Sequence, residues 1–302
     1  MLLIYSYATD APPQAAVNLG RGFAWPSGLA GRGVSWQHLA MLDVASDIAP
    51  AIPRAALVTG GAQRLGRAIA LGLAGAGFAV AVHCRDSMAA AEETAEAVRA
   101  RGVRAAILRA DLMDEAATAG LLPAAAAALG PVGVLVNNAA AFERDEWHDA
   151  TRTSWDLHMQ SNLRAPFVLM QAFAQALPEA AEGVVINMLD QRVFSLTPHF
   201  VSYTVSKAGL WVLTQTMALA LAPRIRVNAI GPGPALPSWR QTASQFAAQS
   251  ERLPLRHGTT PEEVARAALA ILALPALTGQ MWLLDGGQHL QWGPAVASPV
   301  EE

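Results

Sequence analysis

Cysteine, lysine and charged residues in general are scarce in this chain of 302 residues. The lone Cys84 excludes a disulfide framework and a cysteine-rich metal site, and the seven histidines lack the spacing typical of metal ligands. Charged residues make up 15% and the net charge is −3, which excludes a highly charged disordered chain and a basic surface for nucleic acid. No apolar run reaches the ~18 residues that span a bilayer, and the start lacks the features of a secretory signal. We therefore expect a globular, cytoplasmic protein without metal, nucleic-acid or membrane partners.

The first 53 residues differ in composition from the rest. They hold five prolines and scattered glycines, and follow neither the two-residue period of a strand nor the 3.6-residue period of a helix. We expect a poorly ordered leader here, and its origin stays open between a native extension and a misassigned start, with Met41 as the alternative first residue. Residues 54–290 are expected to form one folded domain, followed by a short C-terminal tail over 291–302.

From Ala55 onward, short apolar runs alternate with alanine-rich helical stretches. The expected strands are 55–59, 78–82, 104–108, 132–136, 184–188, 225–230 and 280–285, and the expected helices are 65–76, 88–101, 114–129, 151–177, 203–222 and 261–274. Apolar strands separated by helices predict a parallel sheet covered on both faces. This is a Rossmann-like, doubly wound α/β fold of three layers, which binds ligands at the carboxyl ends of its strands.

A glycine-rich segment, VTGGAQRLGRAIA (58–70), joins the first expected strand to the first helix. Gly60, Gly61 and Gly66 permit a tight turn whose backbone N–H groups approach a pyrophosphate at the helix N-terminus. The spacing departs from strict G-x-G-x-x-G, so a glycine-rich turn without a ligand remains an alternative.

Tyr203 is the only tyrosine of the main domain, and Lys207, the only lysine of the chain, follows four residues later. Positions i and i+4 share one helix face, so the ammonium group can lie beside the phenol. A nearby positive charge favours the phenolate and lowers a tyrosine pKa from its ordinary value of ~10, which suits proton transfer to a substrate near neutral pH. The alternative is a partly buried tyrosine beside a surface lysine.

These motifs, with NNAA (137–140), Asn162, RVNAIGPG (226–233) and LDGG (284–287), are similar to those of the short-chain dehydrogenase/reductase family over about residues 54–290. The resemblance implies a nicotinamide cofactor and a homo-oligomer, a tetramer or a dimer. It implies that Tyr203 donates a proton, that Lys207 binds the nicotinamide ribose and that Asn162 orders a proton-relay water. By position, the expected cofactor-binding residues are Gly60, Gln63, Arg64, Leu65, Gly66, His83, Arg85, Ser87, Asp111, Leu112, Asn138, Ala139, Ala140, Tyr203, Lys207, Pro232 and Gly233. Among them, Asn138 would support a strand end and Asp111 would hold the adenine.

Asp190 stands 13 positions before Tyr203, where this family usually has a catalytic serine. A carboxyl group can deliver a proton or bond a protonated heterocycle, whereas a hydroxyl only steadies a carbonyl. Here the chain resembles pteridine reductases and bacterial dihydromonapterin reductases, as it does with Arg64 in the glycine turn and Phe142 placed to stack on a pterin. This resemblance implies hydride transfer from NADPH to a dihydropterin, with Arg64, Phe142, Asp190 and Tyr203 binding the substrate and protons from Tyr203 and Asp190.

Several alternatives stay open beside that hypothesis. Asp190 fits a carbonyl or alcohol oxidoreductase of another small substrate, or an inactive NADP(H)-binding regulator. Phe142 fits a core or rim aromatic, and Arg64 fits a partner of the cofactor phosphates alone. The segment from Pro234 to His257 is expected to close over the substrate, with Trp239, Arg240 and Phe246 as candidate contacts.

The choice of cofactor depends on VHCRDS (82–87), at the end of the second expected strand. NAD usually requires a carboxylate there for its ribose 2′-hydroxyl, whereas the NADP 2′-phosphate requires cationic and hydroxyl groups. His83, Arg85 and Ser87 favour NADP(H), and Asp86 opposes it.

Overall fold

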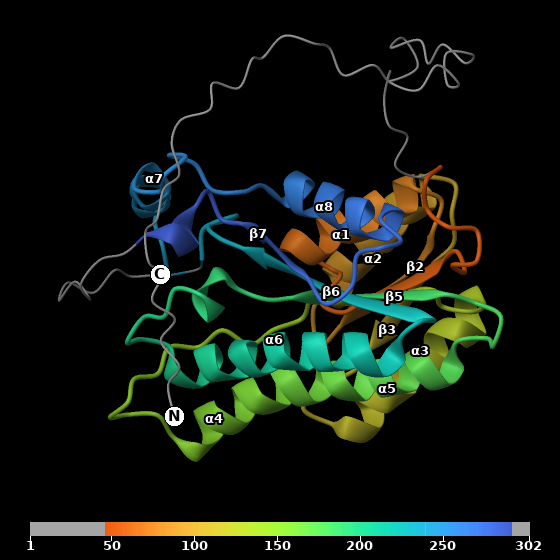
Figure 1. Cartoon of the computed structure of the whole chain (residues 1–302), viewed down its shortest axis with the longest axis horizontal. Helices are drawn as coiled ribbons and strands as arrows, with labels where there is room; N and C mark the ends of the chain where they lie inside the picture. The colour runs from red at the N-terminus through yellow and green to blue at the C-terminus, as the bar shows by residue number, and fades with distance from the viewer. Residues whose placement is uncertain (1–45, 239, 292–302) are drawn as a thin grey trace, which may run out of the picture. The chain divides into compact units, whose positions relative to one another are not determined.

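The computed structural model of the chain describes residues 46–238 and 240–291. Within these residues the strands form one seven-stranded sheet, ordered β3-β2-β1-β4-β5-β6-β7, in which every neighbouring pair is parallel (Figure 1). The strands are β1 (Ala55–Val58), β2 (Ala79–Cys84), β3 (Ala105–Arg109), β4 (Val134–Asn137), β5 (Gly183–Met188), β6 (Ile225–Pro232) and β7 (Met281–Leu284). The predicted doubly wound fold is confirmed. The strand order reverses between β1 and β4, and the crevice at that point is where such sheets bind ligands.

Helices cover both faces of the sheet (Figure 1). They are α1 (Arg64–Gly75), α2 (Met88–Arg99), α3 (Glu115–Leu129), α4 (Arg152–Met159), α5 (Ala165–Ala176), α6 (Val201–Leu221), α7 (Ala243–Glu251) and α8 (Pro261–Ala273). Helices α1, α2 and α8 lie on one face and α3, α5 and α6 on the other. Among the described residues, none of the helices combines the length and apolar character needed to cross a bilayer.

Alternate residues of each strand supply the two apolar cores. In β1, Ala56 and Val58 belong to the core under α1 and α8, whereas Ala55 and Leu57 belong to the core over α3 and α5. Successive side chains of a strand point to opposite faces, so a strand covered on both sides must be apolar throughout. That requirement explains why unbroken apolar runs, and not alternating ones, located the strands in the sequence.

The expected leader boundary at residue 54 lies too far along the chain. Ile48 and Ile52 are 2% and 1% exposed and belong to the core under α1. The amide of Glu182 donates to the carbonyl of Ala51 at 3.0 Å, and Arg54 Nη2 donates to the carbonyl of Ile48 at 3.1 Å. Residues 46–53 are therefore part of the folded domain, because burial of the two isoleucines outweighs the irregular, proline-containing pattern around them. The other residues assigned to the leader, Met41 included, and the tail from 292 lie outside the described residues.

Two further differences lie near the predicted site. The helix expected over 151–177 is divided into α4, a π-helical turn (Gln160–Arg164) and α5. A short helix, α7, forms within the segment from Pro234 to His257, for which no helix was predicted. Single π-helical turns occur frequently at functional sites, and this one contains Asn162.

Candidate active site

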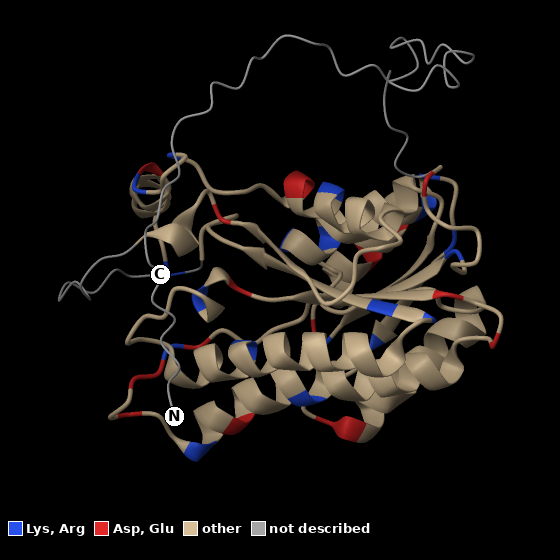
Figure 2. Ribbon diagram, viewed as in Figure 1, with Lys and Arg blue, Asp and Glu red and all other residues tan. Residues whose placement is uncertain are grey.

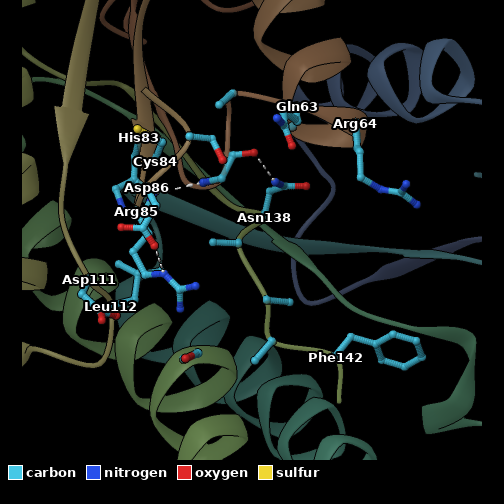
Figure 3. A pocket seen from close by; sticks show the side chains of 18 of the residues that line it. Gln63, Arg64, His83, Cys84, Arg85, Asp86, Asp111, Leu112, Asn138 and Phe142 are labelled. Atoms are coloured by element: carbon cyan, nitrogen blue, oxygen red, sulfur yellow. Dashed lines mark hydrogen bonds and ion pairs between the residues drawn. The ribbon is translucent and has the colours of Figure 1, made fainter. Parts of the chain in front are cut away.

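Two adjacent pockets open at the carboxyl ends of the strands. The larger, about 660 Å³, lies over the glycine-rich turn and the ends of β2 and β4 (Figure 3). The smaller, about 230 Å³, lies between Asp190 and α7, and the two pockets share Arg64, Leu65 and Phe142 as lining residues. The larger pocket brings together most of the predicted cofactor residues, namely Gly60, Gln63, Arg64, Leu65, Gly66, His83, Arg85, Ser87, Asp111, Leu112, Asn138, Ala139 and Ala140. Pro232 and Gly233 line the smaller pocket instead.

The glycine-rich turn is held against the end of β4. Gly60 has φ +59°, and a Cβ atom on Gly66 would lie 2.1 Å from the Gly60 carbonyl oxygen, so both positions require glycine. Asn138 Nδ2 donates to the carbonyls of Thr59 (2.8 Å) and Gly60 (3.1 Å). Asn138 thus ties the strand end to the turn, as its predicted supporting role requires.

His83 braces the same turn and carries no positive charge. It is 2% exposed, its Nδ1 accepts from the Gly60 amide at 3.1 Å, and its Nε2 lies 3.1 Å from the Ala110 carbonyl. The proton therefore sits on Nε2, and burial lowers the imidazole pKa. His83 lines the larger pocket as predicted, but both of its ring nitrogens bond within the protein, so its predicted preference for a phosphate stays a prediction.

Positive charge near the end of β2 comes instead from two arginines. Arg85 Nε donates to Asp86 Oδ2 at 2.7 Å, and Arg109 lies 3.6 Å from the other carboxylate oxygen of Asp86. Arg109, which the sequence analysis missed, ends β3 opposite Cys84. The signal was available, since parallel neighbours in a sheet bring their carboxyl ends together. Asp86, the residue that argues against NADP, is thus neutralised from both sides.

Tyr203 and Asp190 form a direct pair beside the smaller pocket. Tyr203 Oη donates to Asp190 Oδ2 at 2.8 Å, and Asp190 Oδ1 accepts from the Arg192 amide at 2.9 Å. Burial, together with the charge of Asp190 and its hydrogen bond, raises the pKa of Tyr203 well above its ordinary value. The prediction that Lys207 lowers this pKa is wrong here, because burial and the carboxylate dominate. Tyr203 is consequently a neutral phenol, the form needed to donate a proton.

Lys207 lies one helical turn further along α6, as predicted, but it is not at the surface. It is 3% exposed, its Nζ donates to the Met188 carbonyl at 2.8 Å, and it stands 5.8 Å from the centroid of the Tyr203 ring. Burial lowers the pKa of this ammonium to about 8, although Asp190 acts in the opposite direction. The alternative of a surface lysine beside the tyrosine is therefore excluded.

Asn162 fixes the backbone that follows β4. It is fully buried, and its Nδ2 donates to the Ala141 carbonyl at 3.0 Å and to Ser206 Oγ at 3.1 Å. Its Oδ1 accepts from the Ala141 amide at 2.8 Å. The side chain thus positions the Ala141 peptide, and its part in ordering a water remains a prediction.

Phe142 lies at the boundary of the two pockets. Its ring stacks on Phe200 with centroids 4.6 Å apart and meets the Tyr203 ring edge-on at 4.7 Å. Phe142 therefore belongs to an aromatic cluster and at the same time lines both pockets.

The segment from Pro234 to His257 lines the smaller pocket, and two arginines, one of them within the segment, bond it to the rest of the site. Arg64, which has φ 51°, donates to the carbonyls of Pro237 (3.1 Å) and Leu236 (3.3 Å). Arg240 donates to Glu143 Oε2 at 2.5 Å. Arg64 thus holds this segment instead of pairing only with phosphates, and its predicted contact with a substrate is not tested. Phe246 lines the smaller pocket, and Trp239 lies outside the described residues.

Several known proteins are similar to this chain. The model of the short chain dehydrogenase family matches residues 54–247. Crystal structures of FolM alternative dihydrofolate reductase 1 in complex with NADP are similar: that from Brucella canis is 42% identical, with a TM-score of 0.79 over 83% of this chain and 100% of that chain. The Brucella suis protein is 45% identical, with a TM-score of 0.77 over 79% and 96%. The 3beta-hydroxysteroid dehydrogenase 1 of Eggerthella lenta is 34% identical over 247 residues, which are 78% of this chain and 94% of the relative.

Proposed function

Because the chain belongs to the short-chain dehydrogenase family of oxidoreductases, we propose that it reduces a dihydropterin to a tetrahydropterin with NADPH. The observation that carries the proposal is the Asp190 carboxylate, which accepts from Tyr203 Oη at 2.8 Å and lines the smaller pocket. A pterin has ring nitrogens and an amino group that such a carboxylate can bind. The likeness to FolM structures, named as dihydrofolate reductases, supports the same chemical class.

The larger pocket fits NADP(H). Its glycine turn leaves no room for a Cβ at Gly66. Arg85 lines the pocket at the end of β2, and Arg109 lines an adjoining hollow at the end of β3, so both would offer positive charge to a 2′-phosphate. Asp111 would hold the adenine and Lys207 the nicotinamide ribose. When bound, this cofactor supplies the hydride.

Tyr203 and Asp190 then handle the proton. The phenol is neutral, and its proton, which Tyr203 Oη donates to Asp190 Oδ2 in the absence of substrate, would pass to a ring nitrogen of the substrate as the adjacent carbon accepts the hydride. The negative charge left on the pair lies near the Lys207 ammonium, 5.8 Å from the Tyr203 ring. Phe142 would stack on one face of the pterin and keep it in the plane that hydride transfer requires.

The test is NADPH oxidation with dihydrobiopterin beside a panel of small ketones and quinones. We expect turnover of the pterin, and we expect Asp190→Ser to lower kcat/KM for it about 100-fold while changing any ketone reduction less than threefold. Asp190→Asn is the matched control for shape, since it keeps an oxygen for the Arg192 amide but loses the charge. Turnover of ketones alone would favour the carbonyl oxidoreductase. Saturable NADPH binding without any turnover would favour the regulator.

We further propose that the chain forms a homo-oligomer through the exposed surface of α6 and the neighbouring α5. Few charged residues are seen along these helices (Figure 2). Val212 and Leu219 are 61% and 83% exposed, and Val212 borders an apolar hollow that also contains Leu163 and Phe167. An apolar surface of this kind marks an interaction site, and a second copy of the chain satisfies it symmetrically.

Val212→Glu is expected to shift the purified protein from an oligomer toward a monomer, because a desolvated carboxylate at the interface is costly. Light scattering coupled to size-exclusion chromatography measures the mass. Trp147→Glu, at a residue 84% exposed in the loop before α4 and outside α5 and α6, should leave the mass unchanged. An unchanged mass for Val212→Glu would reject this interface.

A further inference from the structure

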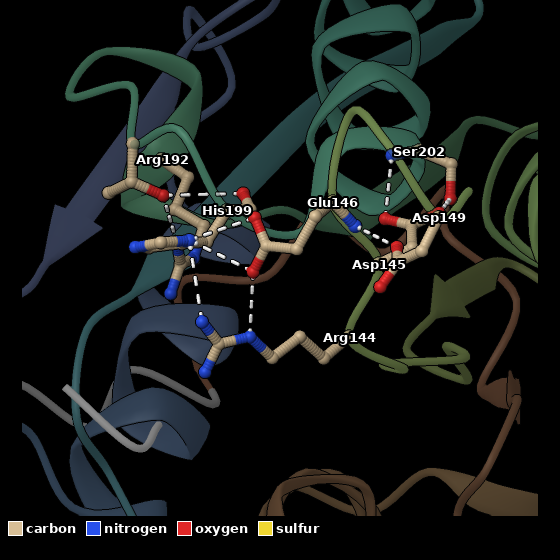
Figure 4. A network of polar contacts seen from close by, with 8 residues as sticks. Arg144, Asp145, Glu146, Asp149, Arg192, His199 and Ser202 are labelled. Carbon is tan, nitrogen blue, oxygen red and sulfur yellow. Dashed lines mark hydrogen bonds and ion pairs between the residues drawn. The ribbon is translucent and has the colours of Figure 1, made fainter. Parts of the chain in front are cut away.

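Three polar side chains lie buried under the loop that carries Phe142. Asp145, His158 and Ser202 are 3%, 0% and 0% exposed, and they come from the loop, from α4 and from α6. His158 Nδ1 lies 2.6 Å from Ser202 Oγ, and Ser202 Oγ donates to Asp145 Oδ2. The Ser202 amide also donates to Asp145 Oδ1 at 3.1 Å, a bond visible in Figure 4. Neither pocket includes any of the three, and the reaction proposed above uses none of them, although the His158 ring meets the Tyr203 ring edge-on with centroids 5.8 Å apart.

The donors and acceptors in this chain of contacts determine which atom carries each proton. The amide of Glu143 can only donate, and it points to His158 Nε2 at 3.1 Å, so Nε2 carries a lone pair. The ring proton of the neutral imidazole is therefore on Nδ1 and is donated to Ser202 Oγ. The hydroxyl proton then goes to the carboxylate. A doubly protonated His158 would place two N–H groups face to face and break the bond to Glu143.

This chain of contacts fixes the loop at two residues, Glu143 and Asp145. His158 holds the amide of Glu143, and Ser202 holds the carboxylate of Asp145. Asn162 holds Ala141 on the other side of Phe142. The Phe142 backbone is thus clamped between two buried groups, and its ring is aimed at the pocket boundary.

The peptide between Phe142 and Glu143 also contacts the segment from Pro234 to His257, which lines the smaller pocket. Arg240 donates to the Phe142 carbonyl at 3.3 Å and to the Glu143 side chain. Loss of the Glu143 amide bond would therefore disturb both the ring at the pocket boundary and the attachment point of Arg240.

We propose that neutral His158 is a positioning residue for substrate binding: by accepting the Glu143 amide it sets Phe142 against the substrate, and its protonation releases the loop. The proposal rests on the proposed function for the identity of the substrate, but the position of the loop is independent of it.

Groups from three neighbouring elements act on His158, among them the Tyr203 ring of α6, which meets its ring edge-on, and the backbone of Ser154 in α4, which favours the imidazolium. Burial is the largest influence and lowers its pKa. Asp145 and Glu143, from the loop, favour the imidazolium, whereas Lys207, from α6, opposes it. With a pKa below its ordinary value of 6.5, His158 is neutral at pH 7 and is protonated only on the acid side.

Two substitutions of similar polarity distinguish the roles of the two ring nitrogens of His158. His158→Gln can place its amide oxygen near the position of Nε2 and keep an acceptor for Glu143. His158→Asn is shorter; it can contact Ser202 but leaves the Glu143 amide without a partner. We expect His158→Asn to raise the KM for dihydrobiopterin about tenfold with kcat and NADPH affinity changed less than twofold, and His158→Gln to restore KM to within about threefold of the wild type.

The pH profile and amide exchange supply readouts that a packing defect would not produce. In the wild type the KM should rise as the pH falls below the pKa of His158, and this acid limb should be missing in His158→Gln. Hydrogen–deuterium exchange of peptides covering residues 141–146 should be slow in the wild type and His158→Gln and at least tenfold faster in His158→Asn. Equal exchange in the two variants, or an acid limb that persists in His158→Gln, would overturn the proposal. Absence of pterin turnover with the expected exchange pattern would reject the proposed substrate and leave the role of His158 standing.

Discussion

Tyr203→Phe is expected to lower kcat for dihydrobiopterin reduction by about 1,000-fold and to leave the Kd for NADPH within twofold. The substitution removes only the oxygen that donates to Asp190 Oδ2 at 2.8 Å. The ring remains, so the edge-on contact with Phe142 and the packing of a side chain that is 6% exposed are both kept. Stopped-flow measurement of NADPH oxidation separates the chemical step from product release.

The double variant Tyr203→Phe/Asp190→Ser tests whether the two side chains act together. If the two groups act as one proton-handling unit, the double variant should be hardly slower than Tyr203→Phe alone, because the unit is already disabled. If the losses of turnover in the two single variants multiply in the double variant, Asp190 acts separately from Tyr203, through substrate binding. Retention of more than about a tenth of wild-type turnover by Tyr203→Phe would remove the phenol from the mechanism.

The parts of the fold that depend on local pattern could be predicted from the sequence. The apolar runs located all seven strands of the described sheet to within a few residues, because a strand buried on both faces leaves no room for polar side chains. Gly60 and Gly66 indicated the position of the larger pocket, in which we propose that the cofactor binds, and their lack of a side chain has a direct steric cause.

The parts that depend on contacts across the sequence could not be predicted. Ile48 looked like part of a proline-rich leader, and only the sheet explains its burial. The sequence placed His83 among the groups that favour a phosphate, but in the structure its two ring nitrogens bond the Gly60 amide and the Ala110 carbonyl. The chain from Glu143 through His158 to Asp145 joins residues up to 57 positions apart. No spacing rule reveals such a set, since each member has an ordinary surface-like neighbourhood in the sequence.

Lys207→Met is expected to abolish turnover, with kcat/KM at pH 7 reduced at least 1,000-fold, without destabilising the protein. The loss of turnover follows from its proposed place between the nicotinamide ribose and Tyr203. The ammonium is 3% exposed, and burial lowers its pKa from 10.5 to about 8. At about 1.4 kcal/mol per pKa unit, burying this charge costs the folded state about 3 kcal/mol at neutral pH. Lys207→Met removes this cost, but it also loses the bond to the Met188 carbonyl, which offsets the gain in stability by about 1–3 kcal/mol.

The pH dependence of unfolding tests the same group without any substrate. Between pH 8 and 10.5 the unfolded chain keeps the Lys207 proton that the folded protein releases, so this group makes the free energy of unfolding rise with pH. Urea denaturation of wild type and Lys207→Met from pH 7 to 9.5 should therefore show the wild type gaining on the variant, while wild-type turnover falls over the same range as the ammonium is lost. The difference between the two proteins cancels the other titrating groups. A constant difference would mean that Lys207 keeps its proton throughout, and the loss of turnover would then need another cause. Opposite slopes for stability and activity would show that the fold accepts a buried charge, at a cost in stability, because the reaction needs it.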